Sequence, residues 1–553
     1  MPNTGKILTI ERFSGGKVGT THVYEFDYTT LTFRPLHVLT DIFCSCAFQI
    51  ADGRVVSFGG YTNDNLGQAL TGVRIYTPSG APGIDGTTDW FEDPTKSILQ
   101  VNRWYPGSHA LPDGRIVAIG GTTDVAPPGV LQPTIEFLNT PNTPPQFLQY
   151  LADTNGANLY PFAWNIPAGG QIPEPGVMAI FARNILGYFD VTTQPGVVTE
   201  LFRAPNAPVA KPAKAGQRVY PLAGGAFMLP AVPDGNNNPL PIELLICGGS
   251  TGSNINATAI DNCIRGFPQQ GTNMTWTIEP MPTPRLFPDL VALPDGTVLI
   301  INGATKGWSG FSAAQNPIMT ALIYNSTAPF GSRYTVVATS TIARLYHSLA
   351  ILGPDGRVFV LGSTPNANSN INDFGPVWPD EYRIEAYVPA YVSYSGLKPS
   401  ISAVTYDPDT FSWSYDQSYT ITAVVPSGDP ANIKFNLLTG KFFNTGVEGS
   451  HGHLINSFAL LLIISSGGFV THANHFGQRQ AYLLITNAAA STDATASANT
   501  FVFTVRAPKN AWVALQGYYM LWIVENNIPA AQANWVQLGG IPPLQADWHP
   551  ELP

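Results

Sequence analysis

The residues best suited to chemistry are a neighbouring tyrosine and histidine, Tyr346 and His347, within Ala343-Arg-Leu-Tyr-His-Ser. Phenol oxygens and imidazole nitrogens are hard-to-borderline ligands, which suit Cu(II). Adjacent side chains on a strand point to opposite faces, so both reach one site only where the backbone bends. Taken alone, such a pair is more typical of a core tyrosine beside a histidine in a turn.

Three further segments strengthen the case for a metal site. Asn102-Arg-Trp-Tyr105 and Asp41-Ile-Phe-Cys44 each precede a hairpin, at places that match the Tyr346–His347 pair. His472 follows a glycine-led run that could form a loop reaching away from its own sheet. The candidate site residues are therefore Cys44, Tyr105, Tyr346, His347 and His472.

A repeated turn-and-strand unit must position these segments. A glycine turn, often Pro-Asp-Gly, precedes an apolar strand and often a glycine pair; its glycines are Gly5, Gly53, Gly114, Gly170, Gly235, Gly296 and Gly356. Their spacing of about 50–65 residues suits a four-stranded kelch-type blade with its loops. Asp-Gly supplies the positive φ of a tight hairpin, and the apolar run after it predicts a buried inner strand. Seven units would close into a ring without exposed edges; a solenoid or a pair of sandwiches is the alternative.

The repeat ends after about residue 388, and alternating strands such as Ser418-Tyr-Thr-Ile-Thr-Ala-Val-Val follow without its turn signature. About 155 residues of this kind fit an immunoglobulin-like sandwich. The sequence thus predicts an all-β chain with a seven-bladed kelch-like β-propeller over 1–395 and an immunoglobulin-like β-sandwich over 396–553.

Composition agrees with this class and excludes others. Charged residues make up 12% of the chain, whereas Gly and Pro number 53 and 49, which suits many short strands and turns. The net charge is −10, and no basic cluster could follow a phosphate backbone, so nucleic-acid binding is not expected. No apolar run reaches the roughly 18 residues of a membrane span.

Residues 1–20 contain no secretory signal sequence, so secretion is expected on other, indirect evidence. Cys247 and Cys263 flank a Gly/Ser/Asn loop and could form a disulfide, which would agree with secretion; two unrelated core thiols are the alternative. Glycosylation acceptors at Asn256, Asn273 and Asn325 permit secretion without proving it.

Together the motifs resemble those of the copper-radical oxidases: galactose oxidase, glyoxal oxidase and the fungal alcohol oxidases. The likeness runs almost end to end, through Thr40-Asp-Ile-Phe-Cys-Ser, Arg103-Trp-Tyr, Asn302-Gly-Ala, Arg344-Leu-Tyr-His-Ser and Thr471-His. Each motif is short, but their joint order and spacing are specific. Arg-Trp-Tyr and Phe-Cys-Ser are closer to glyoxal oxidase than to galactose oxidase.

The resemblance implies a role for each candidate. Tyr105 would be an equatorial ligand of one copper per chain, joined by a thioether to Cys44, so that its ring can hold a stable radical. Tyr346 would be the axial tyrosinate and general base, and His347 and His472 the imidazole ligands. His472 would come from the second domain, through a loop that enters the propeller channel.

The implied reaction is the oxidation of small aldehydes such as glyoxal or methylglyoxal, as hydrates, to acids, with O2 reduced to H2O2. A primary alcohol oxidase using the same site is one alternative. A non-catalytic kelch-type binding protein is another, although it would not need these five residues. A monomer is expected, with peroxidases that use the H2O2 as partners.

The sequence departs from the family pattern at two positions. Cys46 adds a second thiol near Cys44; we choose Cys44, the family register, and expect a buried free thiol at Cys46. Thr123 stands where galactose oxidase has a tryptophan over its crosslink, and loss of that ring should alter radical stability and argues against galactose as substrate. Among other histidines, we expect His451 and His453 in a solvated loop and His475 in the lining of the pocket.

Overall fold

The computed structural model describes residues 4, 6–12, 23–62, 69–93, 95, 98–124, 129–140, 142–154, 158–194, 196–209, 216–365, 378–381, 383–448, 467–472 and 474–549. Strands dominate these residues, and the helices are short: α1 (Gln149–Asp153), α2 (Pro543–Ala546), and the 3-10 turns η1 (Pro268–Asn273) and η2 (Pro430–Asn432). The predicted all-β class is confirmed. None of the helices in the described ranges has the length and apolar character needed to cross a membrane.

A series of antiparallel sheets fills the first two-thirds of the chain, each built largely from strands consecutive in sequence. Their strands are β1 (Lys6–Arg12), β2 (Val23–Asp27) and β3 (Thr32–Leu36); β4 (Cys46–Gln49), β5 (Val55–Phe58), β6 (Val73–Tyr76) and β7 (Trp90–Glu92); and β8 (Gly107–Ala110), β9 (Ile116–Ile119), β10 (Thr134–Phe137) and β11 (Gln146–Phe147). Next come β12 (Phe162–Gly169), β13 (Ile172–Ala182), β14 (Ile185–Asp190) and β15 (Thr199–Arg203), then β16 (Gly224–Met228), β17 (Leu244–Gly248), β18 (Asn262–Gly266) and β19 (Thr277–Pro280). The last are β20 (Asp289–Ala292), β21 (Val298–Ile301), β24 (Thr320–Tyr324) and β25 (Tyr334–Thr339), with the hairpin β22 (Ala304–Gly307)–β23 (Ala314–Pro317), and β26 (Leu349–Leu352), β27 (Val358–Leu361) and β28 (Glu385–Tyr387).

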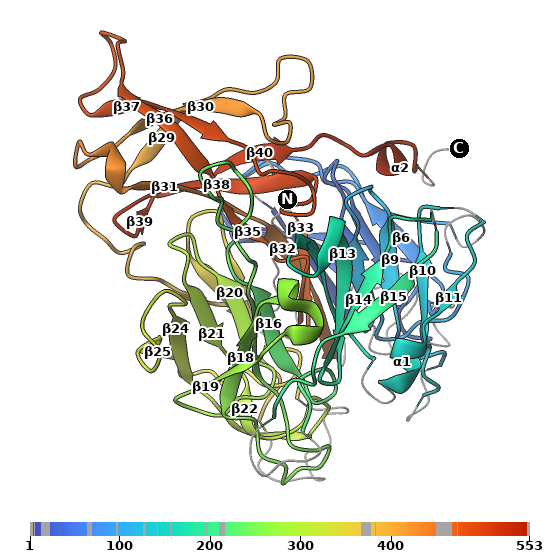
Figure 1. Cartoon of the computed structure of the whole chain (residues 1–553). Coiled ribbons are helices and arrows are strands. Elements are labelled where there is room, and N and C mark those ends of the chain that lie inside the picture. Colours follow the sequence, from blue (N-terminus) through green and yellow to red (C-terminus); the bar gives the residue numbers. More distant parts are fainter. Residues whose placement is uncertain are drawn as a thin grey trace.

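The remaining strands form two further sheets and a central extension. One sheet has the order β29 (Ser400–Val404), β30 (Ser418–Val424), β37 (Thr500–Arg506), β36 (Leu484–Ala490). The other has the order β35 (Gln480–Tyr482), β31 (Ile433–Leu438), β38 (Gly517–Glu525), β39 (Ile528–Pro529), with β40 (Asn534–Leu538) also paired to β38. Their facing side chains pack together, with the Phe435 and Phe503 rings 5.2 Å apart. This pair of sheets lies above the others in Figure 1.

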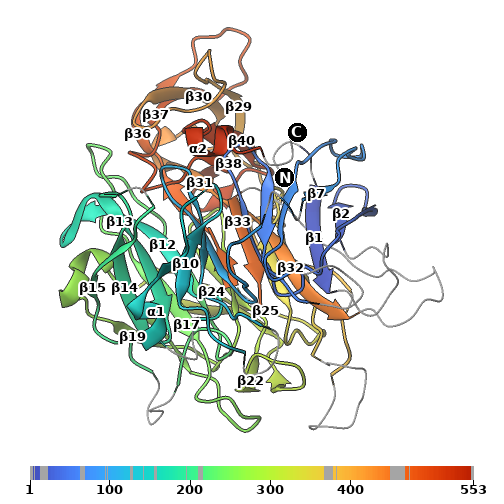
Figure 2. The ribbon, with the colours of Figure 1, turned by 90° about the vertical axis from the view of Figure 1, so that its right-hand side faces the viewer.

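The extension consists of β32 (Gly440–Glu448), β33 (Gly467–Thr471) and β34 (Asn474–Phe476). It leaves the upper sheets and passes down among the sheets of residues 1–390, as both ribbon views show (Figures 1 and 2). β32 pairs in parallel with β1, so that N-terminal and C-terminal strands share one sheet. β33 lies against β4, and β34 lies against β8, β12, β16 and β20. The first strands of successive sheets therefore surround this extension.

The Asp-Gly turns at Gly53, Gly114, Gly296 and Gly356 form as the sequence predicts, with positive φ, and each joins the first strand of a sheet to the second. At Gly235 the prediction is wrong, because the positive φ of that longer loop falls on Asn237, at +65°. Gly5 lies outside the described residues. Gly53 has a φ of +95°, and the Asp52 carboxylate accepts a hydrogen bond from the Arg54 amide at 2.9 Å. The turn at Asp113–Gly114 is closed in the same way. The strand after each turn is buried, as predicted, but the strand before it lies nearest the centre.

Glycine pairs after the second strands allow neighbouring sheets to touch. Gly59 has a φ of +69°, and a Cβ there would lie 2.5 Å from the carbonyl oxygen of Arg103, in the next sheet. A Cβ on Gly60 would lie 2.3 Å from the carbonyl of Asp41. Any side chain would therefore separate the backbones that carry Cys44 and Tyr105.

Cys247 and Cys263 form the expected disulfide. They lie opposite each other on the neighbouring strands β17 and β18. Asn256, on the loop between these strands, is exposed, and so are Asn273 and Asn325.

A candidate metal centre of histidine, tyrosine and cysteine side chains

The loops before the first strands point the candidate side chains toward the centre. Cys44, Tyr105 and His347 each lie two residues before such a strand, with φ values of +56°, +57° and +66°. This left-handed conformation turns the backbone sharply, which a strand does not. The bend required to bring Tyr346 and His347 to one site is therefore present, and their rings lie 3.8 Å apart.

A buried arginine anchors several of these loops. Arg103 donates a hydrogen bond to the Gly120 carbonyl at 2.8 Å, and Arg344 donates one to the Gly362 carbonyl at 2.7 Å. Arg218 and Arg285 make equivalent bonds to the carbonyls of Gly248 and Asn302. In each case an aromatic residue follows two positions later, so the arginine fixes the backbone from which that ring projects; these residues are Tyr105, Tyr220, Phe287 and Tyr346.

His472 comes from the tip between β33 and β34, with a φ of +51°. The extension carries it to the first strands of the sheets, and its Nε2 lies 3.7 Å from the Cys44 Sγ. These two residues are separated by 428 positions in the sequence. The geometry agrees with the expectation that a loop of the C-terminal region brings His472 to the other candidates.

All five candidates converge. Potential ligand atoms of Cys44, His347 and His472 lie within 4.8 Å of one another. The His472 ring lies 4.6 Å from that of His347, 5.3 Å from that of Tyr346 and 5.6 Å from that of Tyr105, measured between centroids. All five residues are at least 93% buried.

Threonine hydroxyls orient both imidazoles. A hydrogen bond of 2.7 Å joins His347 Nδ1 to Thr364 Oγ1, and one of 2.6 Å joins His472 Nδ1 to Thr471 Oγ1. Each ring thereby directs its Nε2 toward the cluster, as outer partners of metal-bound histidines do. Burial lowers the pKa of His472 to about 3, so this imidazole is neutral and can offer a lone pair.

The tyrosine hydroxyls lie in a setting that disfavours their anions. Burial raises the pKa of both Tyr105 and Tyr346 well above 10, and the neighbouring Cys44 and Tyr220 raise them further. A phenolate can form here only when a cation compensates its charge. The neutral His472 imidazole and the His347 ring beside two such phenols therefore make a donor set suited to a metal ion with affinity for nitrogen and oxygen.

Comparison with known proteins places the chain in a family. It matches the family model described as "Glyoxal oxidase N-terminus" over residues 14–391, more than half its length. The chain belongs to the glyoxal oxidase family of copper-radical oxidases. Residues 455–538 match a second model, "Galactose oxidase-like, Early set domain".

The similarity to known relatives extends over almost the whole chain. A WSC domain-containing protein of Arthroderma benhamiae is 33% identical over 98% of this chain, which spans 51% of that protein's length. The aldehyde oxidase GLOX of Vitis pseudoreticulata is 29% identical over 94% of this chain and 86% of its own. A solved fungal alcohol oxidase in complex with copper aligns over 97% of this chain and 95% of its own, with a TM-score of 0.64 and 16% identity.

Cys44 and Cys46, the two cysteines of this glyoxal oxidase family member that lie outside the disulfide, occupy different positions relative to β4. Cys46 begins β4 and is buried beside Ser108, and burial raises its pKa. Cys44 precedes that strand, and its carbonyl accepts a hydrogen bond from the Tyr105 amide at 3.1 Å. Among the described residues, Cys44 is the cysteine that joins the histidine cluster. The expectation that Cys46 is a buried thiol is confirmed.

An aromatic ring does cover Tyr105, although Thr123 cannot provide one. The Tyr220 ring stacks on Tyr105 with centroids 4.8 Å apart and planes inclined by 25°. The expected loss of a stacking ring is therefore corrected: a tyrosine from a different sheet provides it. Sequence reasoning missed Tyr220, but a signal was present, because Arg218-Val-Tyr220-Pro repeats the pattern of Arg103-Trp-Tyr105-Pro.

Of the other histidines considered, His475 is bonded to a carboxylate, and two lie outside the described residues. His475 Nε2 lies 2.8 Å from the Asp289 carboxylate, and both side chains are fully buried, so His475 ties the extension to β20 rather than lining an open pocket. His451 and His453 lie outside the described residues.

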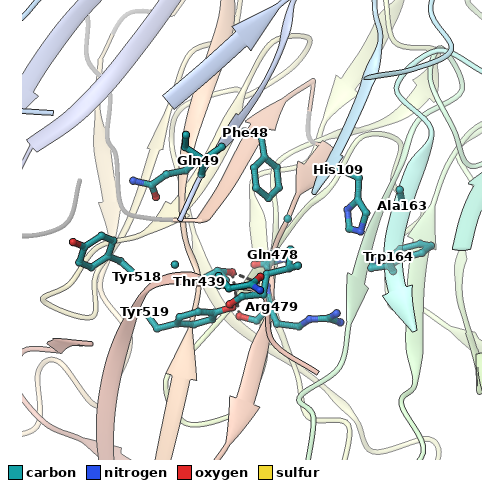
Figure 3. A pocket seen from close by; sticks show the side chains of 15 residues that line it. Phe48, Gln49, His109, Ala163, Trp164, Thr439, Gln478, Arg479, Tyr518 and Tyr519 are labelled. Carbon is teal, nitrogen blue, oxygen red and sulfur yellow. Dashed lines mark hydrogen bonds between the residues drawn. The ribbon is translucent and has the colours of Figure 1, made fainter. Parts of the chain in front are cut away.

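A separate small cavity lies between the first strands and β38, lined among others by His109, Trp164 and Arg479 (Figure 3). Its volume is about 30 Å³. That is room for a water molecule and too little for an aldehyde substrate.

Proposed function

We propose that this protein oxidises small aldehydes of the glyoxal or methylglyoxal type, as their hydrates, to carboxylic acids, and reduces O2 to H2O2. The observation that carries the proposal is the convergence of Cys44, Tyr105, Tyr346, His347 and His472 in one buried cluster. A binding protein of the kelch type would have no need for this set of side chains.

The residues present fit one copper ion. His347 and His472 would hold it through their Nε2 atoms, and Tyr105 and Tyr346 through their phenol oxygens. Copper would supply the one-electron change between Cu(II) and Cu(I), and the charge that the two phenolates require. A thioether between the Cys44 sulfur and the Tyr105 ring would lower the potential of that ring, which could then hold a radical.

Two tyrosines of the protein then have separate roles in the reaction. The Tyr346 phenolate oxygen accepts the hydroxyl proton of the substrate. The oxidised Tyr105 ring accepts a hydrogen atom from the substrate carbon. The buried aromatic surroundings exclude water from the reactive ring. Overall, an aldehyde hydrate and O2 give a carboxylic acid and H2O2, a balanced two-electron exchange.

We infer the architecture that supports this site: a seven-bladed kelch-like β-propeller over 1–395 and an immunoglobulin-like β-sandwich over 396–553. The successive sheets, the contacts between their first strands and the glycine pairs at their junctions support the propeller. The packed pair of C-terminal sheets supports the sandwich. The two family matches divide the chain at a similar place.

The alternative substrate is a primary alcohol oxidised at the same site. The relative from Vitis is named an aldehyde oxidase, whereas the solved structure of similar fold is an alcohol oxidase. Phe43 and Phe311 stand beside His347, with ring centroids 5.8 Å and 5.2 Å away. These apolar rings suit a small, uncharged substrate of either class.

We further propose a secreted monomer whose H2O2 serves peroxidases. The Cys247–Cys263 disulfide and the exposed acceptors Asn256, Asn273 and Asn325 support an oxidising, extracellular environment.

The test is an oxidase assay of the copper-loaded protein with glyoxal, methylglyoxal, primary alcohols and galactose, recording O2 uptake and H2O2 release. We expect the aldehydes to be the best substrates, with one H2O2 formed for each O2 consumed. Cys44→Ser should lose most activity, and Cys46→Ser, the matched control, should retain it. Faster turnover of alcohols would replace the aldehyde assignment, and absence of H2O2 with every substrate would contradict the oxidase.

A further inference from the structure

Tyr220 belongs to the same repeated element as the two ligand tyrosines. Arg103-Trp-Tyr105, Arg218-Val-Tyr220 and Arg344-Leu-Tyr346 each combine a buried arginine with a tyrosine two positions later. Three loops of different sheets thus project three tyrosines into one space. Two of them are candidate ligands, and the role of the third is unassigned by the family's motifs.

The Tyr220 ring covers one face of Tyr105. Its centroid separation of 4.8 Å and its small inclination are those of an offset-stacked pair. Tyr160 meets Tyr105 edge-on instead, at 5.3 Å and 88°. The Trp104 ring is closer, with its centroid 4.3 Å from that of Tyr105, but its plane is inclined by 42°. Among the described rings around Tyr105, Tyr220 is therefore the one stacked most nearly parallel to the ring proposed to carry the radical.

The Tyr220 hydroxyl contacts the other ligand tyrosine. Its oxygen lies 2.7 Å from the Tyr346 hydroxyl oxygen, a hydrogen bond between two buried groups. The Tyr220 ring also stands edge-on to His472, with centroids 5.3 Å apart. The Tyr220 side chain thus contacts Tyr105, Tyr346 and His472, which come from three different parts of the fold.

We propose that Tyr220 is a positioning residue that joins the two ligand tyrosines: its ring shields and stabilises the oxidised Tyr105, and its hydroxyl fixes the orientation of Tyr346. The inference rests on the proposed copper-radical function. The two contacts are chemically distinct, so they can be removed separately. Tyr220→Phe keeps the stacked ring and removes the hydroxyl, whereas Tyr220→Leu removes both.

The experiment follows the radical and the copper rather than turnover. Copper-loaded protein is oxidised with ferricyanide, which takes one electron from the crosslinked tyrosine and becomes ferrocyanide. The oxidant is removed, and the decay of the radical absorption is timed. Electron paramagnetic resonance of the unoxidised Cu(II) protein reports on the ligand geometry. Tyr188→Phe is the matched control, because it also removes a buried tyrosine hydroxyl, one that contacts Met274 and lies outside the cluster.

We expect Tyr220→Leu to shorten the radical lifetime about tenfold, the effect of losing one stacked pair, and Tyr220→Phe to leave it close to that of the wild type. Tyr220→Phe should change the copper spectrum, and Tyr188→Phe should change neither property. An unchanged lifetime in Tyr220→Leu, or an unchanged copper spectrum in Tyr220→Phe, would overturn the proposal. If Tyr220→Leu does not fold, the two phenylalanine variants are compared instead. A radical lifetime shortened equally in Tyr220→Phe and Tyr188→Phe would then overturn the proposal.

Failure of the proposed function gives a different result. In that case the wild type itself would form neither a thioether nor a radical absorption. A wild type that forms both, with a radical insensitive to Tyr220, would refute the role of Tyr220 alone.

Discussion

Four of the five candidate residues hold a left-handed backbone conformation: Cys44, Tyr105, His347 and His472. For side chains of this kind the conformation costs of order 1–3 kcal/mol each. The arginine anchors, the glycine pairs and the packed rings maintain it. The surrounding structure thus holds these four residues in a backbone conformation that they disfavour, at the positions where their side chains converge. Such strain is typical of a functional site.

His109 lies outside the candidate metal site and should make the stability of the protein depend on pH. Burial lowers its pKa to about 4, so between about pH 6.5 and 4 the unfolded chain binds a proton that the folded protein does not. The free energy of unfolding should therefore fall as pH decreases through this range, with a contribution of about 3 kcal/mol from His109. His109→Gln should reduce the slope of the free energy of unfolding against pH in chemical denaturation experiments. Equal slopes in the two proteins would contradict this assignment.

The five candidate residues could be singled out from the sequence because each lies in a short motif with a fixed order, and the structure brings their side chains together. Tyr220 could not be assigned in this way, since its stacking on Tyr105 depends on two sheets meeting side by side. Thr364 was missed for a similar reason: the sequence does not show that its hydroxyl meets the His347 ring.

At the scale of elements, the β33–β34 hairpin brings His472 to the cluster. The pure protein should bind about one copper per chain, and His472→Ala should lose most of that affinity because one of two imidazoles is removed. Elemental analysis after dialysis measures this, with His37→Ala as control, since His37 is exposed and bonded to Asp89. Stoichiometric copper in His472→Ala would exclude that residue from the site.

The disulfide joins two neighbouring strands, β17 and β18, and closes a loop of 16 positions. The double variant Cys247→Ser/Cys263→Ser should lower the free energy of unfolding by about 3 kcal/mol, because the unfolded chain gains freedom. Denaturant titration of the two proteins measures the difference. Equal stability, or recovery of both cysteines as free thiols from a secretory host, would contradict this prediction.

Turns and strands differed in how well the sequence predicted them. The Asp-Gly turns were recoverable because aspartate and glycine have specific roles in a hairpin, as Asp52 and Gly53 show. The position of each strand within its sheet was harder to predict, since an apolar run indicates that a strand is buried but not how close it lies to the central extension. The parallel pairing of β32 with β1 joins residues more than 400 positions apart and has no local signal.

At the scale of the whole molecule, neither end of the chain can complete the site alone. Cys44 and Tyr105 come from early sheets, Tyr346 and His347 from a late one, and His472 from the extension. The C-terminal segment also contacts the N-terminal part of the chain, because Arg54 donates hydrogen bonds to the carbonyls of Gln545 and Trp548. Assembly of the centre therefore requires both regions to be folded together.

The most direct test is the mass of the intact chain after exposure to copper and O2. A thioether between Cys44 and Tyr105 removes two hydrogens, so the mass should fall by about 2 Da, and the denatured chain should migrate faster on a reducing gel. Cys44→Ser should abolish both changes, and Cys46→Ser should retain them. If Cys46→Ser alone abolishes them, the crosslink is two residues away from its assigned position. An active wild-type enzyme with no change in mass, and with activity unaffected by either substitution, would contradict the copper-radical centre itself.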